Sequence, residues 1–511
     1  MIQIALKKYS PIRRTAAVAA IGAIFLVLSG CGTIFRPVVI PQPVSGPPAQ
    51  PIAYAAVVSW VGQSNLGIAN IIDYSGDTFL AESQIGPGPL TFTVDGTGTN
   101  SYSLNSDTTL SNFQVSSNLQ YKNLGFSTLP GGTNTPQYSG IFSPNTGLWI
   151  TDANNAQVDI LTGVPATFKL SVPVAPLPVL SVGPNTGALR NYVVSQNNST
   201  SSTLSYGVTC NISPHAQTQL GEADGIELQT YTVSARIPVG VCPVYAIESP
   251  SQRRVFVLNR GSDTVTVINS QLNTLDNQCP PPTGCVNEAG QTYFTHPTLP
   301  LSLTAVANTG ITPPNGTSGM TQYAGPVYAE YNQATQQLVV ADYDGGTITV
   351  IDVSLDLYGN DSQTFGTTYT IPVGNNPASV TALFDGSRAY TANQADGTVT
   401  VVDLVSHSVE KTLAVNGNPR SVASTQNSQY GKVYVVSPNS PYMTIIRTDL
   451  DIVDTALLIE GSPLDVRTSN QNGSSGNANT TSRLPGVGQP CFLPPSMLPA
   501  NPTLQQCQQI P

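Results

Sequence analysis

The chain has 511 residues, a formal net charge of −10 at pH 7 and only 9% charged residues. Globular domains usually contain roughly 25% charged residues, and here Gly, Pro, Ser, Thr and Asn take up the difference. This composition argues against a nucleic-acid partner, because phosphate binding needs clustered Lys and Arg side chains. A chain of this length can bury one large core or repeat a small core many times.

The N-terminus has the layout of an export signal. Two Lys and two Arg between residues 7 and 14 precede an apolar run at 16–28, and the sequence LSGC at 28–31 ends it. The run is short for a membrane span, which needs about 20 apolar residues. The segment resembles the bacterial lipoprotein signal, which implies that Cys31 becomes the lipidated first residue of the mature protein. An ordinary secretory signal with an incidental cysteine is the alternative.

The residues after Cys31 extend this interpretation. Gly32 follows the cysteine, whereas Asp at this place marks retention in the inner membrane. The resemblance therefore implies an exported protein anchored to the outer membrane, on its periplasmic or its cell-surface side. Residues 31–52 contain six prolines, and they predict an extended tether between the anchor and the following domain.

From residue 53 the chain has the pattern of an all-β protein. Short runs rich in Val, Ile, Thr and Tyr alternate with Gly, Pro, Asn and Asp. A proline recurs between these runs at intervals of 42–51 residues, with two longer intervals of 65 and 83 residues. The base interval is the length of a four-stranded propeller blade. The prolines are Pro89, Pro136, Pro178, Pro243, Pro326, Pro377, Pro419 and Pro463.

Two strands of the repeat are clearest in the second half of the chain. The first aligns 254–259, 388–393 and 432–437 (RVFVLN, RAYTAN and KVYVVS), and the second aligns 264–269, 347–352 and 398–403 (TVTVIN, TITVID and TVTVVD). Tight-turn residues such as Asp396 and Gly397 separate them, as in an antiparallel hairpin. The motifs resemble the repeat of the bacterial YVTN β-propeller family. This resemblance spans most of 54–468 and implies a propeller of four-stranded blades.

The order of the strands predicts how the ring closes. The first repeat starts at 54–60 with the second strand of a blade, and a spare strand follows Pro463 at 464–468. Docking this strand into the first blade would remove exposed sheet edges. Eight proline turns favour eight blades, with seven as the alternative if 90–135 is not a full blade. The predicted parts are a signal peptide (1–30), a Pro-rich tether (31–52), the propeller (53–468) and a flexible tail rich in Ser, Asn, Gly and Pro (469–511).

Six cysteines follow Cys31, and an even number in an exported chain indicates disulfides. Nearest-neighbour pairing gives Cys210–Cys242, Cys279–Cys285 and Cys491–Cys507, the last closing a loop in the tail. Six cysteines allow 15 connectivities, so other pairings stay open. Metal binding is the less favoured alternative, because the chain has no CxxC motif and only three histidines.

Two repeats are overlong. The fourth has its excess at 196–224, between the second and third strands, and the fifth has excesses at 271–299, between strands three and four, and at 307–325, before the next blade. Loops between second and third strands emerge on the same face as the connections between blades. We therefore expect 196–224 and 307–325 to be neighbours on one face, with 271–299 on the opposite face. The paired insertions are the predicted contact site, and idle surface loops are the alternative.

Four residues are candidates for ligand binding because they lie where the loops would meet at the mouth of the ring: Arg260, Asp342, Asn393 and Arg420. Carboxylates also recur at the turns between second and third strands, at Asp152, Asp263, Asp342, Asp344 and Asp396. Such carboxylates could line one face and hold a cation. Asp favours these turns for local reasons as well, and this structural interpretation is the preferred one.

The histidines give a weaker signal. His215 lies in the 196–224 insertion with Glu222 and Asp224 nearby in sequence, which would suit a metal or an acid/base role. A solvated loop is the favoured alternative. His296 and His407 have no such neighbours in sequence. No catalytic residue, metal or cofactor is therefore predicted.

These observations favour a binding or scaffolding module at the bacterial cell envelope. Its membrane contact is the lipid anchor, and its partner is an envelope protein, a glycan or a small ligand. The alternative is an enzyme of the lactonase type, which would need a metal-binding cluster of carboxylates and Asn in the central channel. Quinone-dependent dehydrogenases, which the fold also resembles, need Trp-rich motifs, and the chain has two Trp. A structural envelope component is a third class, and the fold alone does not decide among them.

Overall fold

The structure, a computed structural model, describes residues 54–61, 66–74, 76–95, 98–115, 136–143, 147–163, 166–183, 189–197, 210, 214–301, 303, 323–425 and 428–469. All described residues belong to one compact unit of the chain, within Gly46–Pro511. The predicted signal peptide, the tether and the tail beyond Ser469 lie outside the described residues. Within the described part of the chain, no helix is long and apolar enough to cross a membrane.

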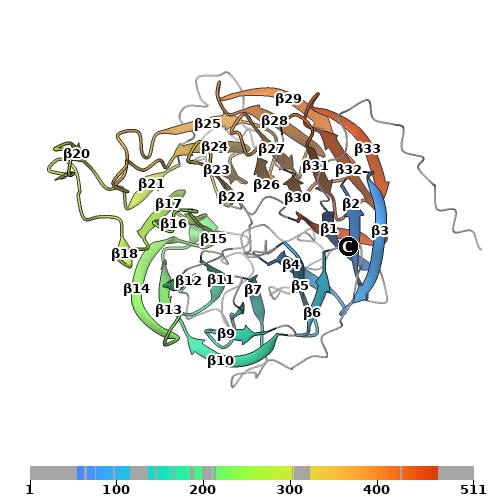
Figure 1. Cartoon of the computed structure of the whole chain (residues 1–511), viewed down its shortest axis with the longest axis horizontal. Helices are drawn as coiled ribbons and strands as arrows, with labels where there is room; N and C mark the ends of the chain where they lie inside the picture. The colour runs from blue at the N-terminus through green and yellow to red at the C-terminus, as the bar shows by residue number, and fades with distance from the viewer. Residues whose placement is uncertain are drawn as a thin grey trace, which may run out of the picture. The chain divides into compact units, whose positions relative to one another are not determined.

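The strands form eight antiparallel sheets, which are the blades of a ring with one strand of each blade innermost (Figure 1). From the inside outwards, blade 1 is β34 (Ser462–Thr468), β1 (Tyr54–Val61), β2 (Leu66–Asp73) and β3 (Thr78–Ile85); blade 2 is β4 (Pro89–Val94), β5 (Asn100–Asn105) and β6 (Leu110–Gln114); blade 3 is β7 (Tyr138–Phe142), β8 (Leu148–Asp152), β9 (Gln157–Thr162) and β10 (Thr167–Pro173); and blade 4 is β11 (Pro178–Val182), β12 (Arg190–Ser195), β13 (Leu220–Glu227) and β14 (Thr232–Val241).

Blades 5 to 8 follow the same order. Blade 5 is β15 (Pro243–Glu248), β16 (Arg254–Asn259), β17 (Thr264–Asn269) and the short outer strands β18 (Thr274–Leu275) and β21 (Thr298–Pro300); blade 6 is β22 (Pro326–Asn332), β23 (Gln337–Asp342), β24 (Thr347–Asp352) and β25 (Thr368–Pro372); blade 7 is β26 (Pro377–Ala382), β27 (Arg388–Asn393), β28 (Thr398–Asp403) and β29 (Ser408–Ala414); and blade 8 is β30 (Ser421–Ser424), β31 (Lys432–Val436), β32 (Tyr442–Arg447) and β33 (Ile452–Leu458). Strands β19 (Cys285–Val286) and β20 (Thr292–Tyr293) form a separate hairpin.

The structure confirms the predicted all-β propeller and its eight blades. The segment 90–135 does contain a blade, because β4, β5 and β6 pair in order there, so the alternative of seven blades is wrong. The strand pair at 388–393 and 398–403 has the predicted bounds.

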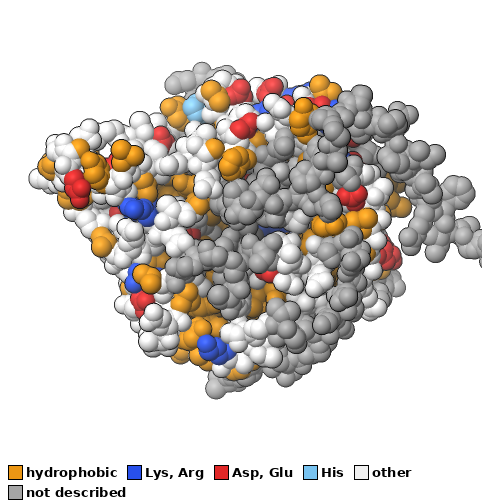
Figure 2. Space-filling model, in the orientation of Figure 1, with side chains coloured by type: hydrophobic (Ala, Val, Ile, Leu, Met, Phe, Trp, Pro, Cys, Tyr) orange, Lys and Arg blue, Asp and Glu red, His pale blue; other side chains and the backbone are white. Residues whose placement is uncertain are grey.

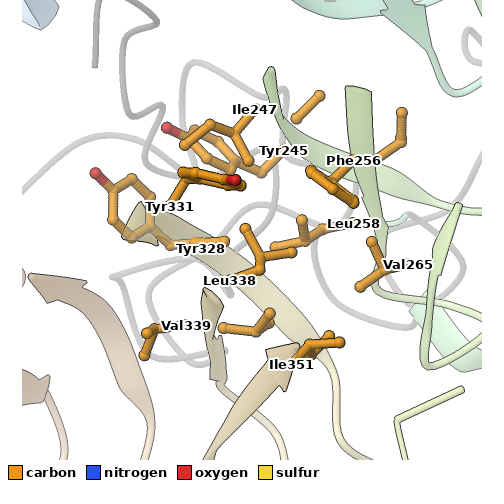
Figure 3. Packing of buried hydrophobic residues seen from close by; sticks show 14 of the residues in the cluster. Tyr245, Ile247, Phe256, Leu258, Val265, Tyr328, Tyr331, Leu338, Val339 and Ile351 are labelled. Carbon is orange, nitrogen blue, oxygen red and sulfur yellow. The ribbon is translucent and has the colours of Figure 1, made fainter. Parts of the chain in front are cut away.

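The core lies between neighbouring blades, since each sheet packs against another on both of its faces. All residues of β16 are buried, whereas the outer strand β29 exposes every residue except Leu413. Figure 3 shows Tyr245 of blade 5 beside Tyr328 of blade 6, and their ring centroids are 4.7 Å apart. The second and third strands therefore need apolar residues on both faces, which explains their nearly continuous Val and Ile runs.

The insertions connect to the blades at defined places. The insertion at 196–224 lies between β12 and β13, as predicted, and the insertion at 307–325 lies in the connection before β22. The sequence places the excess at 271–299 between the third and fourth strands of blade 5. Instead β18 and β21 both pair with β17, one at each end, so this insertion interrupts the outer strand itself.

The ring closes as predicted, through the antiparallel pairing of β34 with β1. Val57 faces Val466 in the register of these two strands, and Leu464 and Val466 are buried. A second link joins blade 8 to blade 1, where Lys432 Nζ lies 2.6 Å from Asp77 Oδ2 and donates to the Tyr74 carbonyl oxygen. The two ends of the propeller sequence are therefore held by one blade.

Removing β34 should destabilise the whole ring. A chain that ends at Gly461 loses the burial of Leu464 and Val466, and each of these side chains contributes about 1.5–3 kcal/mol. We expect the Tm measured by circular dichroism to fall by at least about 5 °C. A chain that ends at Ser469 keeps β34 and is the control, and its Tm should equal that of the full chain. Equal Tm values for the two truncated chains would contradict closure by β34.

Candidate functional site

The candidate site lies where the insertions at 196–224 and 307–325 meet, beside the turns of blades 5 and 6. His215 belongs to the short 3-10 helix η4 (Pro214–Ala216), within the connection from β12 to β13. Its ring stacks on Tyr323, three residues before β22, with centroids 3.7 Å apart and an interplanar angle of 8°. The predicted neighbourhood of the two insertions is therefore confirmed.

A disulfide anchors the first insertion. Cys210 is bonded to Cys242, which directly precedes β15 and is buried. The Pro214 carbonyl oxygen lies 3.6 Å from Cys242 Sγ, so the start of η4 is held against the same cysteine. Cys279–Cys285 is the other disulfide that the described residues contain, and both pairs match the prediction. Cys491 and Cys507 lie outside the described residues.

Both ring nitrogens of His215 face oxygen atoms of blades 5 and 6. Its Nε2 lies 3.2 Å from Asp344 Oδ2, and its Nδ1 lies 3.7 Å from Asp263 Oδ2 and 3.3 Å from the Gly261 carbonyl oxygen. Arg260 donates to both oxygens of Asp344, at 2.9 and 2.7 Å. Burial by itself raises the pKa of Asp344, but Arg260 and His215 outweigh it and lower the pKa to about 2. Asp344 is therefore a fixed anion that holds Arg260 and His215 together.

Glycines at two turns of blade 6 let the second insertion approach. A Cβ at Gly345 would lie 3.0 Å from Leu303 and 3.2 Å from the Tyr323 carbonyl oxygen. Gly325 has φ +62°, and a Cβ there would overlap Asp344, at 1.9 Å from its Oδ2. Asp263 Oδ1 accepts a hydrogen bond from the Gly325 N–H at 2.7 Å, which fixes the chain just before β22. Glycine at 325 and 345 therefore allows the segment around Tyr323 to pack against the turn of blade 6 that carries Asp344.

The structure brings only Arg260 of the four predicted ligand-binding residues into this cluster. Arg260 is 2% exposed and its guanidinium is bound to Asp344. Asp342 ends β23 and is fully buried, where it accepts hydrogen bonds from two threonine hydroxyls of β24. Arg420 is buried before β30, with its N–H bonded to the Val436 carbonyl oxygen.

Asn393, at the end of β27, joins its strand to the next strand of the same blade. Its Nδ2 donates to Thr398 Oγ1 at 3.0 Å and to Thr400 Oγ1 at 2.8 Å, both on the next strand. A Cβ at Gly374 would lie 2.7 Å from Asn393 Cγ, so the preceding connection needs glycine. Asn259 makes the equivalent bonds in blade 5. The final Asn of the repeated strand therefore stabilises its own hairpin.

The structure does not group His215 with Glu222 and Asp224, and the favoured interpretation of a solvated loop is wrong for the two acidic residues. Both acidic residues lie in β13, which begins at Leu220, so they are not part of a loop. Asp224 is buried and accepts a hydrogen bond from the Ala175 N–H, and Glu222 pairs with Arg236. The partners of His215 come instead from blades 5 and 6, which are distant in sequence.

The turn carboxylates do not form a cation site in the described residues. Asp152 and Asp396 accept hydrogen bonds from nearby backbone N–H groups, of Gln137 and Asn375 respectively. Within the described part of the chain, no group of three or more His, Cys, Asp or Glu is arranged to hold a metal ion. The sequence analysis did not identify Tyr323 as a site residue. The one signal that could have indicated it was the expected contact between the insertions at 196–224 and 307–325.

The fold defines this chain as an eight-bladed β-propeller. No family model matches the sequence, and no curated protein matches it significantly. The solved structure of apo AztD from Citrobacter koseri is similar, with 12% identity, a TM-score of 0.52 and coverage of 82% of this chain and 98% of AztD. The dihydro-heme d1 dehydrogenase NirN in complex with DHE is also 12% identical, with a TM-score of 0.50 and coverage of 85% and 80%. Such low identities establish a shared fold only.

The pH dependence of stability should report the buried carboxyl of Asp342. Burial raises its pKa to about 7 from 3.8, although the Thr349 and Thr347 hydroxyls lower it. Between these two pH values the folded chain binds more protons than the unfolded chain, so stability falls as the pH rises. We expect Asp342→Asn, which places there the residue found at 259 and 393, to gain on the order of 2 kcal/mol over the parent at pH 8 and little at pH 4.

Urea denaturation of both proteins at pH 4, 6 and 8 measures this difference. Asn393→Asp is the reverse control, since it should become less stable than the parent as the pH rises. A difference between Asp342→Asn and the parent that does not change with pH would contradict a neutral, buried Asp342.

Proposed function

We propose that the protein is an exported, lipid-anchored binding or scaffolding module of the bacterial cell envelope. Its contact site for an envelope protein, a glycan or a small ligand is the surface around His215 and Tyr323. The observation that carries this proposal is the stacked pair itself, because it joins an insertion of blade 4 to the connection between blades 5 and 6 on one face of the ring. Tyr323 stays 40% exposed in this position, so an aromatic ring is held rigidly at the surface.

The state of the charged groups supports binding over catalysis. Asp344 is engaged by Arg260 and His215, and Asp263 by the Gly325 N–H and His215. Such a network fixes the positions of loops, because each group already has its partner inside the protein. The surface that results is preorganised, which reduces the entropy lost when a partner binds.

Two features support the proposed location. The disulfides Cys210–Cys242 and Cys279–Cys285 suit an oxidising compartment, since such bonds rarely persist in the cytosol. The basic, apolar and small residues before Cys31 supply the export signal and the site of lipidation in the sequence. Lipid attachment at Cys31 would hold the propeller at the membrane surface through the 31–52 tether.

Affinity purification from detergent-extracted native envelopes tests the contact site. We expect a stoichiometric partner to be recovered with the parent and with the control Tyr442→Ser. Tyr442 is a residue of blade 8 and is 43% exposed. Recovery should fall at least about tenfold with Tyr323→Ser, because aromatic side chains dominate contact energies. Mass spectrometry identifies the partner and gives its stoichiometry.

Two outcomes would contradict the proposal. Undiminished recovery with Tyr323→Ser would show that the partner binds elsewhere. Retention of Cys31→Ser in the membrane fraction to the same extent as the parent would show that the anchor is not this cysteine. Circular dichroism of each variant checks that the ring remains folded.

A further inference from the structure

A second, independent surface is formed by the insertion that interrupts the outer strand of blade 5. Residues 276–297, here called the arm, contain the hairpin of β19 and β20, and the disulfide Cys279–Cys285 closes its base. The hairpin lies outside the ring, beyond β18 and β21 (Figure 1). The arm and the His215 cluster lie at opposite ends of β16, since one contacts Arg254 and the other follows Asn259. The expected placement on opposite faces is therefore confirmed.

A buried cluster of charges fixes the arm to the ring. Arg254 Nε lies 2.9 Å from Asp276 Oδ2, and Arg254 Nη2 lies 2.8 Å from Asp361 Oδ1. All three side chains are 3% exposed or less. His296, at the other end of the arm, places Nδ1 3.0 Å from Asp361 Oδ2 and stacks against Phe365. Burying charges is costly, so a cluster of this kind is better suited to fixing one geometry than to adding stability. Both ends of the arm are thus tied to one point.

The loop that joins β24 to β25 in blade 6, residues 353–367, contacts the hairpin at several points. Asn287 Nδ2 donates to Asp356 Oδ2 at 3.2 Å, and Gln363 Nε2 donates to the Thr292 carbonyl oxygen at 2.8 Å. Arg253 Nη1 donates to the Tyr358 carbonyl oxygen at 3.1 Å. The arm and this loop therefore form one continuous surface region.

This region exposes large apolar side chains. Leu357 is 100% exposed, Val286 is 66% exposed and Tyr358 is 42% exposed. The contact between Asn287 and Asp356 brings the segments that carry them together. Figure 2 shows hydrophobic side chains beside an acidic one at the outer end of the arm. Clustered apolar side chains at a surface mark a site of contact with a protein or a membrane.

We propose that the arm and the adjoining loop are a docking surface for a second protein, one that offers an apolar depression bordered by basic side chains. The charges favour a protein over a bilayer. Asp356 and the exposed Glu288 flank the apolar side chains and outweigh the charge of Arg253 at the Tyr358 carbonyl oxygen. The chain also has a net charge of −10, so an anionic lipid surface would repel this region. The disulfide and the charge cluster hold the arm in one shape before binding, as suits insertion into a preformed depression.

Site-specific photocrosslinking in the native envelope tests this surface with the full chain. A benzoylphenylalanine replaces Leu357 in one protein and Val405, 76% exposed in a turn of blade 7, in the control. We expect one protein adduct at 357 that is absent at 405. The captured protein, once purified, should bind the parent and Val405→Ser equally and bind Leu357→Ser about tenfold or more weakly in titration calorimetry.

Three results would overturn the proposal. The first is the same adducts at 357 and 405, or none at either. The second is equal affinity of the captured protein for the parent and for Leu357→Ser. The third is flotation of the parent, but not of Leu357→Ser, with vesicles of phosphatidylethanolamine and phosphatidylglycerol, which would assign the surface to the membrane. Leu357 makes no part of the core, so these variants remain folded.

Discussion

The antiparallel pairing of β34 with β1 is the interaction on which the rest of the molecule depends. It completes blade 1 with a strand from the other end of the propeller sequence, and the Lys432–Asp77 pair links blade 8 to blade 1. Each blade then has a neighbour on both sides, so the apolar faces of its inner strands are covered. The connections on the two faces of the ring are thereby held at fixed distances from one another.

Blade 5 uses this fixed frame at both ends of a single buried strand. At the Asn259 end of β16, Arg260 holds Asp344 and, through it, His215 of the first insertion. At the Arg254 end, Arg254 holds Asp276 of the arm and Asp361 of the next blade. In each case one arginine crosses to a carboxylate of blade 6, so the inserted segments are fixed by charge where the apolar core ends.

The repeat made most of the fold predictable. Strands such as 388–393, the closing strand after Pro463 and the shared face of two insertions all follow from blade order. The partners of His215 do not follow from blade order. Asp344 lies 129 residues away in sequence, and the nearer Glu222 and Asp224 belong to β13. Asp342 and Asn393 resemble mouth residues in sequence, yet their bonds to threonines of the next strand use them inside the blade. Local patterns specify strands, whereas such sites depend on which loops the ring brings together.

The central claim is that two insertions distant in sequence support each other on one face of the ring. Hydrogen exchange followed by mass spectrometry, comparing the parent with Tyr323→Ser, measures this dependence directly. The account predicts faster exchange in residues 214–219, where the Gln217 N–H is bonded to the Pro214 carbonyl oxygen, and no change in the arm. Unchanged exchange at 214–219, or an equal increase in the arm, would contradict it.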